Sequence, residues 1–294
     1  MASGSFLSET IMKTKQVLFL TAIVVSVSIA GFAQNAGLIK RTTYKTDKLE
    51  FGAGGTLSII GAPNGSIQIE GWSERSVEIS ATIEIQAPTE ADLDRLAKVT
   101  GFITDESLGR TGITSIGTHD KQYLKSADKK FPKNLLGLPF KIDYVIKVPR
   151  YCELMVDGGK GNLTISGVEG NMKINYLESD ADLRLVGGAV IATVGTGNVN
   201  VTIPNRSWRG SFADIQVANG NLNLNLPTGL NADFDAVILR NGKIENGFTG
   251  FVPKTRKTEF TDKSIMAKSG TGSISLKFTV GDGTMKISEI GKPS

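Results

Sequence analysis

The sequence predicts an all-β protein in which a β-rich N-terminal region with one short helix precedes a parallel β-solenoid, or β-helix. Three observations support this fold class. The 294 residues include 34 glycines and only 9 prolines, a composition typical of many short strands joined by tight turns. Apolar and polar residues alternate along most of the chain, and the segment GTGNVNVTIP at 195–204 nearly repeats as ANGNLNLNLP at 218–227. Such recurrence indicates stacked structural repeats.

The first segment is a targeting sequence. Residues 12–33 begin with two lysines, continue through an apolar run from Val17 to Ile29 and end in small residues, as in a signal peptide. We interpret residues 1–33 as a signal peptide with an upstream extension. No later segment holds eighteen consecutive apolar residues, so we expect no membrane span after cleavage. The protein is then exported, either to the periplasm or to the cell surface and beyond, and a retained anchor is the alternative.

Charge and reactive residues exclude several classes of function. The formal net charge of +4 falls to +3 when the leader takes away Lys13, Lys15 and Glu9, too small a charge to indicate nucleic-acid binding. Cys152 is the only cysteine, so the exported chain has no intramolecular disulfide. With one cysteine and one histidine, His119, the sequence predicts no zinc site, no other metal and no cofactor.

Residues 34–148 form the predicted β-rich N-terminal region. Alternation of apolar and polar residues predicts strands near 56–60, 66–70 and 77–86. One helix is expected in 88–100, because Thr89 can cap its N-terminus and apolar residues share one face. This helix is short and amphipathic, so we expect it to cover a sheet.

The alternation stops in residues 107–140, which we interpret as a long irregular insertion. Basic residues outnumber acidic residues in the part of this segment that carries the following basic side chains: Arg110, Lys121, Lys125, Lys129, Lys130 and Lys133. Irregular segments of this length inside a domain are uncommon and are often functional or mobile. A solvated excursion without a partner and a binding loop for an acidic surface are both open.

Residues 149–294 are the predicted solenoid repeats. Leu222 and Leu224 alternate with Asn221 and Asn223, which in a strand places leucines on one face and asparagines on the other. The turn glycines Gly197, Gly220 and Gly242 recur after 23 and 22 residues, and Gly272 follows after 30. A solenoid with about twenty residues per coil explains this recurrence. Since Asn-Gly is also a hairpin signal, an antiparallel sandwich is the alternative.

Stacking also predicts a role for the asparagines and glycines. Asn198 and Asn221 would occupy equivalent positions in successive coils, where their amides can hydrogen-bond in a ladder. The neighbouring glycines would supply the positive backbone φ that the corners require.

The same residues resemble a known family. The strand IDYVIKVPR at 142–150, followed by GNLTI at 161–165, GNVNV at 197–201 and GSISL at 272–276, is similar to the bacterial putative-adhesin family of unknown function. The resemblance covers roughly residues 142–285. It implies a secreted or envelope-associated parallel β-helix without an established activity, and it offers no catalytic residues to carry over.

We find no residues that predict catalysis. Ser115, His119 and Asp120 are the ingredients of a nucleophilic site, but such sites depend on geometry that sequence spacing does not fix. The glycine-rich segments at 52–55 and 158–161 lack the pattern of a phosphate-binding loop.

Acidic and aromatic residues give only weak candidates for ligand binding. Asp180 and Asp182 are two residues apart, as in some calcium loops, but the spacing does not continue. The aromatics Trp72, Tyr176 and Trp208 could stack on sugar rings. The ligand-binding candidates are therefore Trp208 with its neighbours Arg206 and Arg209 in the segment NRSWRG.

These observations predict a non-catalytic exported β-solenoid, an adhesin-like surface or envelope scaffold that contacts polysaccharide or an envelope protein. Two alternatives are open. One is a carbohydrate-active enzyme, a polysaccharide lyase or hydrolase built on a β-helix, which would need convergent carboxylates on neighbouring coils. The other is a periplasmic partner in envelope signalling. The sequence leaves the coil handedness and the oligomeric state open.

Overall fold

The structure is a computed structural model that describes residues 37–291 except 53, 108, 205–207 and 258. The predicted signal peptide at 1–33 and the candidate Arg206 therefore lie outside the described residues. Within the described ranges, no helix is both long and apolar enough to cross a membrane.

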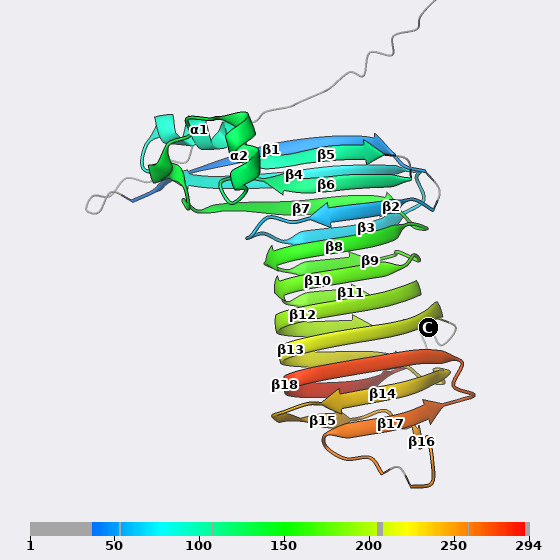
Figure 1. The fold of residues 1–294 in the computed structure, drawn as a ribbon. Helices are drawn as coiled ribbons and strands as arrows, with labels where there is room; N and C mark the ends of the chain where they lie inside the picture. The colour runs from blue at the N-terminus through cyan, green and yellow to red at the C-terminus, as the bar shows by residue number, and fades with distance from the viewer. Residues whose placement is uncertain (1–36, 53, 108, 205–207, 258, 292–294) are drawn as a thin grey trace, which may run out of the picture.

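The predicted all-β class is confirmed (Figure 1). The strands of the N-terminal part are β1 (Ile39–Glu50), β2 (Thr56–Ile60), β3 (Ile67–Trp72), β4 (Ser76–Ala87), β5 (Gly101–Ser107), β6 (Arg110–Ile116) and β7 (Phe140–Pro149). The central strands are β8 (Glu153–Lys160), β9 (Leu163–Ser166), β10 (Met172–Glu178), β11 (Ala181–Arg184), β12 (Gly187–Thr202) and β13 (Arg209–Pro227). The C-terminal strands are β14 (Ala232–Ile238), β15 (Gly242–Asn246), β16 (Val252–Pro253), β17 (Ser264–Ser269) and β18 (Ile274–Ile290). The helices are α1 (Glu90–Val99), α2 (Lys121–Ala127) and the 3-10 turn η1 (Lys133–Leu135).

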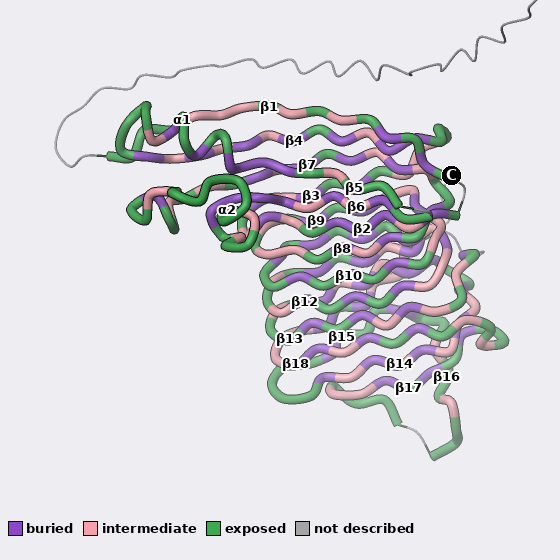
Figure 2. The backbone as a smooth tube through the Cα atoms, turned by 45° about the horizontal axis from the view of Figure 1, so that its top comes forward, coloured by how far each residue is buried: buried purple, intermediate pink, exposed green. Residues whose placement is uncertain are grey.

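All these strands belong to one mixed sheet, which folds into two walls that face each other across the core (Figures 1 and 2). The first wall contains, in spatial order, β1, β4, β7, β3, β9, β11, the C-terminal halves of β12, β13 and β18, and β15. The second wall contains β5, β6, β2, β8, β10, the N-terminal halves of β12, β13 and β18, and then β14, β17 and β16.

The direction of pairing differs between the centre and the ends. Leu154, Met172 and Val190 are neighbours in parallel strands, each 18 residues after the last, and Ala213 follows Val190 after 23 residues. Parallel stacking is therefore present from β8 to β13, but the sheet as a whole is mixed, and the prediction of parallel coils throughout 149–294 is not met. Antiparallel pairs, by contrast, join β1 to β4, β4 to β7, β5 to β6, β14 to β17 and β16 to β17.

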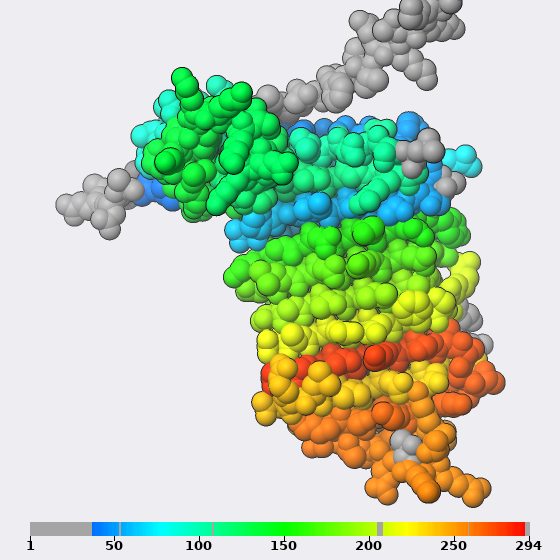
Figure 3. Space-filling view, in the orientation of Figure 1, coloured from blue at the N-terminus to red at the C-terminus, as the bar shows by residue number. Residues whose placement is uncertain are grey.

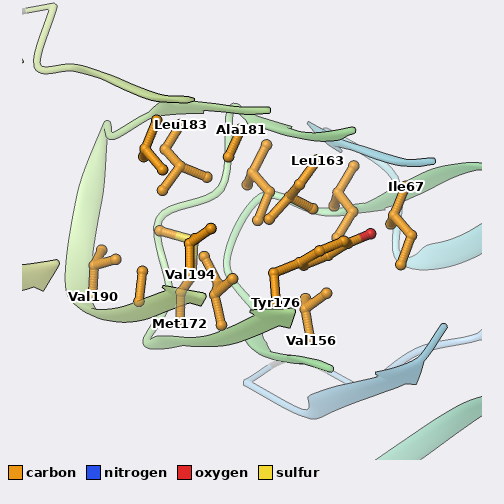
Figure 4. Close-up of a cluster of buried hydrophobic side chains, with 14 of the residues drawn as sticks. Ile67, Val156, Leu163, Met172, Tyr176, Ala181, Leu183, Val190 and Val194 are labelled. Carbon is orange, nitrogen blue, oxygen red and sulfur yellow. The ribbon is translucent and has the colours of Figure 1, made fainter. Parts of the chain in front are cut away.

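Side chains from both walls meet in a continuous apolar core. Figure 4 shows Leu163, Ala181 and Leu183 of the first wall lying opposite Met172 and Val190 of the second. All five are at most 3% exposed. Since inward and outward residues alternate along each strand, every wall buries one residue in two, and full burial of a large aliphatic side chain contributes about 1.5–3 kcal/mol.

The order of the last strands corrects one sequence prediction. β18, the final strand of the chain, lies between β13 and the pair β14 and β15 (Figure 1). Gly220 therefore has Gly283 as its neighbour in the next layer, and Gly242 stacks on the far side of Gly283. The prediction that Gly242 follows Gly220 directly is wrong, and Gly272 lies outside this column, beside Asp233 and Lys268.

Residues 107–140 and the helix count also differ from expectation. The predicted helix is confirmed as α1, with the Thr89 hydroxyl accepting a hydrogen bond from the backbone N–H of Asp92 at 3.2 Å. A second helix, α2, was not predicted; the carboxylate of Asp120 caps it by accepting from the N–H groups of Gln122 and Tyr123. The segment is thus not a long irregular insertion, because it also contains the whole of β6, whose Ile113 is fully buried.

Candidate functional site

The first wall presents a regular polar surface, which we call the amide face. It consists of outward residues of β11, β12 and β13 and of the residue just before β11. These residues are Asp180, Asp182, Asn198, Asn200, Asn221, Asn223 and Asn225. These side chains point outward because Val199, Val201, Leu222 and Leu224, which alternate with them, are buried. Stacked strands lie about 4.8 Å apart, so the face repeats its polar groups at this interval. Figure 3 shows the central layers stacked in sequence between the two ends.

Hydrogen bonds between layers hold the amide face. The Asn221 amide donates to Oδ1 of Asn198, and the Asn223 amide donates to Oδ1 of Asn200, both at 2.9 Å. The predicted asparagine ladder is therefore confirmed. Each of these bonds uses one N–H and one oxygen, and an amide has two N–H donors and an oxygen with two lone pairs. Donors and acceptors thus remain along the surface for an outside ligand.

The acidic residues of this face are partly engaged in the same ladder. One Asp180 oxygen accepts from both the backbone N–H and the side-chain amide of Asn198, at 2.9 and 3.0 Å. Within the ranges that the structure describes, no three His, Cys, Asp or Glu side chains gather as metal ligands. The calcium-like spacing of Asp180 and Asp182 therefore corresponds to a structural capping contact at Asp180.

Of the three predicted ligand-binding residues, the two that the structure describes do not share an open site. Trp208 is 7% exposed, and its ring lies over Gly210, where an added Cβ would come within 2.1 Å of it. A buried ring face is closed to a sugar. Arg209 lies on the outside, and Arg206 is outside the described residues. Their role in ligand binding stays a prediction.

Arg209 instead belongs to an ion-pair cluster that the sequence did not indicate. Its Nη2 lies 2.8 Å from Oε1 of Glu169, and Nη2 of Arg150 lies 2.5 Å from the same oxygen. Glu169 is only 6% exposed, whereas both arginines are about half exposed or more. These residues are up to 59 positions apart in the chain, so only the parallel stacking of the layers brings them together.

The other two aromatic candidates are also engaged. Tyr176 is 4% exposed and packs over Gly158, where an added Cβ would be 2.2 Å from the ring; burial raises the pKa of its hydroxyl. The Trp72 indole N–H donates to the Ser76 carbonyl at 2.9 Å. The ammonium of Lys147 lies 5.3 Å from the centre of the same ring.

The residues considered for nucleophilic chemistry are separated by their contacts. Ser115 is 1% exposed, and its hydroxyl lies 2.7 Å from the hydroxyl of Tyr144. His119 stacks on Phe140 with ring centres 5.4 Å apart, and burial lowers the pKa of its imidazole. The serine hydroxyl is therefore bonded to a neutral phenol and not to the histidine.

The second wall carries a surface groove of about 490 Å³. Met155, Lys173 and Ile191 form its floor from three stacked strands. Glu153 is its only lining carboxylate, and that carboxylate already accepts hydrogen bonds from Thr56 and Asn171, both at 3.1 Å. Most glycoside hydrolases use two carboxyl groups that flank the substrate, a pair that the described lining of this groove does not contain.

Comparisons with known proteins give fold-level likeness without an assignment. No family model matches this chain, and no curated protein matches its sequence. A putative cell adhesion protein from Clostridium sporogenes is similar in structure at a TM-score of 0.46 and 14% identity, over 85% of this chain and 100% of that one.

Two further solved structures show weaker likeness. A putative adhesin from Bacteroides fragilis has a TM-score of 0.26 and 10% identity, over 83% of this chain and 96% of that one. A putative lipid binding protein from Parabacteroides distasonis has a TM-score of 0.23 and 10% identity, over 85% and 95%. Two of the three are described as putative adhesion proteins. With every TM-score below 0.5, we carry over no property from them.

Proposed function

We propose that the protein is a non-catalytic exported scaffold, in which the parallel layers from β8 to β13, continued by β18, form a short β-solenoid and the amide face contacts an extended polysaccharide. The observation that supports this function is the hydrogen-bonded ladder of Asn198, Asn200, Asn221 and Asn223. It fixes planar amides in two parallel rows without the entropy cost of ordering them on binding.

The spacing of the face suits a repeating ligand. The two amide-bearing layers, β12 and β13, lie about 4.8 Å apart, an interval comparable to the length of one sugar ring in an extended glycan. The flanking layers present Asp180 and Asp182 on one side and Lys286 and Ser288 on the other. A glycan hydroxyl both donates and accepts hydrogen bonds, as does a side-chain amide. A long ligand of this kind gains affinity from many weak contacts in series.

The test is binding of the full chain to a panel of insoluble and soluble polysaccharides, measured by retention and calorimetry. We expect Asn200→Leu together with Asn223→Leu to weaken retention about ten-fold or more. The matched control is Asn175→Leu, which removes an exposed amide bonded to Asp157 on the opposite wall, and we expect it to leave retention unchanged.

Two results would overturn this function. One is the absence of retention on every polysaccharide in the panel, with capture of a single stoichiometric envelope protein instead, which would support the signalling alternative. The other is turnover of a polysaccharide that disappears when one carboxylate, such as Glu153, is replaced by its amide. That outcome would establish the enzyme alternative.

A further inference from the structure

A second cavity lies at the opposite end of the molecule from the C-terminal strands, where the two walls end in β1 and β5 (Figure 1). The volume of this cavity is about 490 Å³, within the range of about 300–1,000 Å³ that is usual for small-molecule sites. Both helices contribute to it, α1 through Ala97 and Lys98 and α2 through Tyr123. It is separate from the amide face.

The cavity exists because the two outermost strands do not pair with each other. β1 pairs only with β4, and β5 only with β6. Side chains link them instead: the Lys45 ammonium donates to the Phe102 carbonyl at 2.6 Å, and the Thr104 hydroxyl donates to Asp47 at 3.2 Å. The end of the apolar core is therefore reached from outside between these contacts.

The lining combines an apolar floor with an apolar mouth. Ile83, Phe102 and Ile116 are at most 7% exposed and form the inner part. Tyr44 and Ile103, which are 48% and 46% exposed, lie at the surface of the same cavity. Large apolar side chains left open to water beside a cavity mark a binding site more often than a plain surface does.

The charge of the lining is one-sided. It includes Arg41, Lys45 and Lys98 but no carboxylate. Arg41 is neutralised by ion pairs with Asp94 at 2.7 Å and Glu90 at 2.6 Å. The ammonium of Lys45 lies 4.2 Å from the centre of the Phe102 ring; burial lowers its pKa, and the nearby carboxylate of Asp47, which lies outside the lining, partly opposes that shift. In the described ranges Lys98 has no ion-pair partner.

A buried polar group in the lining also lacks a partner. Thr100 is only 7% exposed, and among the described residues no group forms a hydrogen bond with its buried hydroxyl oxygen. A buried hydroxyl without a partner costs free energy, and a ligand with a hydrogen-bonding head would relieve that cost. The C-terminal end of α1 carries a partial negative charge, which disfavours an anion at this place. The full positive charges of the Lys98 and Lys45 ammonium groups outweigh it.

From this geometry we infer that the cavity binds a single-chain amphipathic anion, a fatty-acid-like molecule whose alkyl chain lies against Ile83, Phe102 and Ile103 and whose head group contacts Lys45, Lys98 and Thr100. Two observations carry this assignment: cations without lining carboxylates, and the orphan hydroxyl. It concerns a small-molecule site at the N-terminal end and does not depend on polysaccharide binding at the amide face.

The test compares dodecanoate with dodecyltrimethylammonium, each below its critical micelle concentration, by calorimetry on the full chain. The two probes share an alkyl chain and differ in head-group charge. We expect dodecanoate to bind about ten-fold tighter or more. Lys98→Gln and Lys45→Met should each weaken dodecanoate several-fold, whereas Ala97→Trp should fill the cavity and abolish binding of both probes.

The matched control is Lys286→Gln, which removes an exposed lysine from β18 far from the cavity, and it should leave both affinities unchanged. Thermal unfolding verifies that each variant is folded. If Lys45→Met does not fold, the exposed change Lys98→Gln decides the role of charge. Equal affinity for both probes, absence of binding, or dodecanoate binding that survives Ala97→Trp would each overturn the assignment.

Discussion

The central layers, from β8 to β13, and the two ends of the molecule differ in how their strands pair. In the centre every neighbour is parallel, and each residue stacks on an equivalent one 18 or 23 positions away. At the N-terminal end β1, β4 and β7 alternate in direction, and at the C-terminal end β18 returns to lie inside the stack. Repeated parallel layers extend the stack, whereas its two ends are formed by antiparallel pairs and by a strand that returns from later in the chain.

The reason lies in the unpaired backbone groups of an outermost strand. Any edge offers a row of free N–H and C=O groups to another chain. Here the N-terminal edge is bordered by α1, whose Leu93 and Leu96 are buried, and by lysines of β1 such as Lys48, bonded to Glu78. At the C-terminal end, the second wall finishes in the two-residue strand β16 and the first in the five-residue strand β15, so both edges are short.

The largest difference between centre and end should come from the core. Leu224 is fully buried between layers, so Leu224→Ala should cost about 2–5 kcal/mol of unfolding free energy. Ile244 is 8% exposed in β15, which pairs with β18 alone. Ile244→Ala should therefore lower the free energy of unfolding by less, near the lower limit of that range, because side chains at the edge can move into the cavity that the substitution leaves. Urea unfolding measures both, and equal losses would contradict a graded core.

The corner glycines test the same contrast through the backbone. Gly220 has φ +135°, and an added Cβ would lie 1.9 Å from the Gly197 carbonyl oxygen. Gly220→Ala should cost more than the about 1–3 kcal/mol of backbone strain alone, because the layers must also separate.

Two glycines near the N-terminal end provide controls. Gly54 has φ +72° but nothing within 4 Å of an added Cβ, and Gly52 has open space without the positive φ. We expect the order of destabilisation in urea to be Gly220→Ala, then Gly54→Ala, with Gly52→Ala nearly neutral. If Gly54→Ala costs as much as Gly220→Ala, close stacking is not what selects glycine at the corner.

This comparison also explains what the sequence reveals. Alternation and the spacing of Gly197 and Gly220 were enough to predict parallel neighbours, because both residues lie in adjacent layers that follow each other along the chain. The same spacing misplaced Gly242, since a local repeat carries no information about a strand that returns 63 residues later to lie between two layers. The helix α2 was missed because seven residues rich in lysine show little periodicity, although Asp120 gave a capping signal.

The candidate surfaces follow the same rule. The amide face was predicted from sequence because Asn198 and Asn221 repeat at the period of the stack. The N-terminal cavity was not, because it gathers residues from segments that share no period. The cluster of Arg150, Glu169 and Arg209 lies within the stacked layers, but its residues differ in type and therefore show no repeat in the sequence. Trp208 is a candidate for sugar binding only because it is aromatic. Its burial depends on packing over Gly210, which the sequence of the local segment does not specify.

A smaller effect is expected for the amide ladder. A hydrogen bond between neutral groups contributes about 0.5–1.5 kcal/mol net, and exposure reduces that contribution. A double-mutant cycle between Asn200→Ala and Asn223→Ala should therefore give a coupling energy of about 0.5 kcal/mol. The control cycle pairs Asn200→Ala with Gln216→Ala on the opposite wall, where coupling should be absent. Equal coupling in both cycles would mean that the ladder adds nothing to stability.

The smallest effect concerns pH and separates the N-terminal end from the centre. Asp143 of β7 begins a column that continues through Ser66 and Asp180 to Asn198 and Asn221, so one carboxylate stands at its N-terminal end and another precedes the two amides. Burial alone would raise the pKa of Asp143, but the hydrogen bonds from Lys141 and Ser66 outweigh it and lower that pKa below 3.8. Both the N–H and the hydroxyl of Ser66 donate to this carboxylate, at 2.8 and 2.7 Å.

A carboxyl group whose pKa is lower in the folded than in the unfolded state stabilises the fold above the unfolded value, and this stabilisation is lost as the pH falls through the folded value. Stability of the wild-type chain should therefore fall below pH 3.8 more steeply than that of Asp143→Asn, when urea unfolding is followed across that window. Asp182→Asn, at an exposed aspartate without a hydrogen-bond partner in the described ranges, should keep the wild-type slope. Identical slopes for wild type and Asp143→Asn would show that the charge of Asp143 does not contribute to stability at this end of the column.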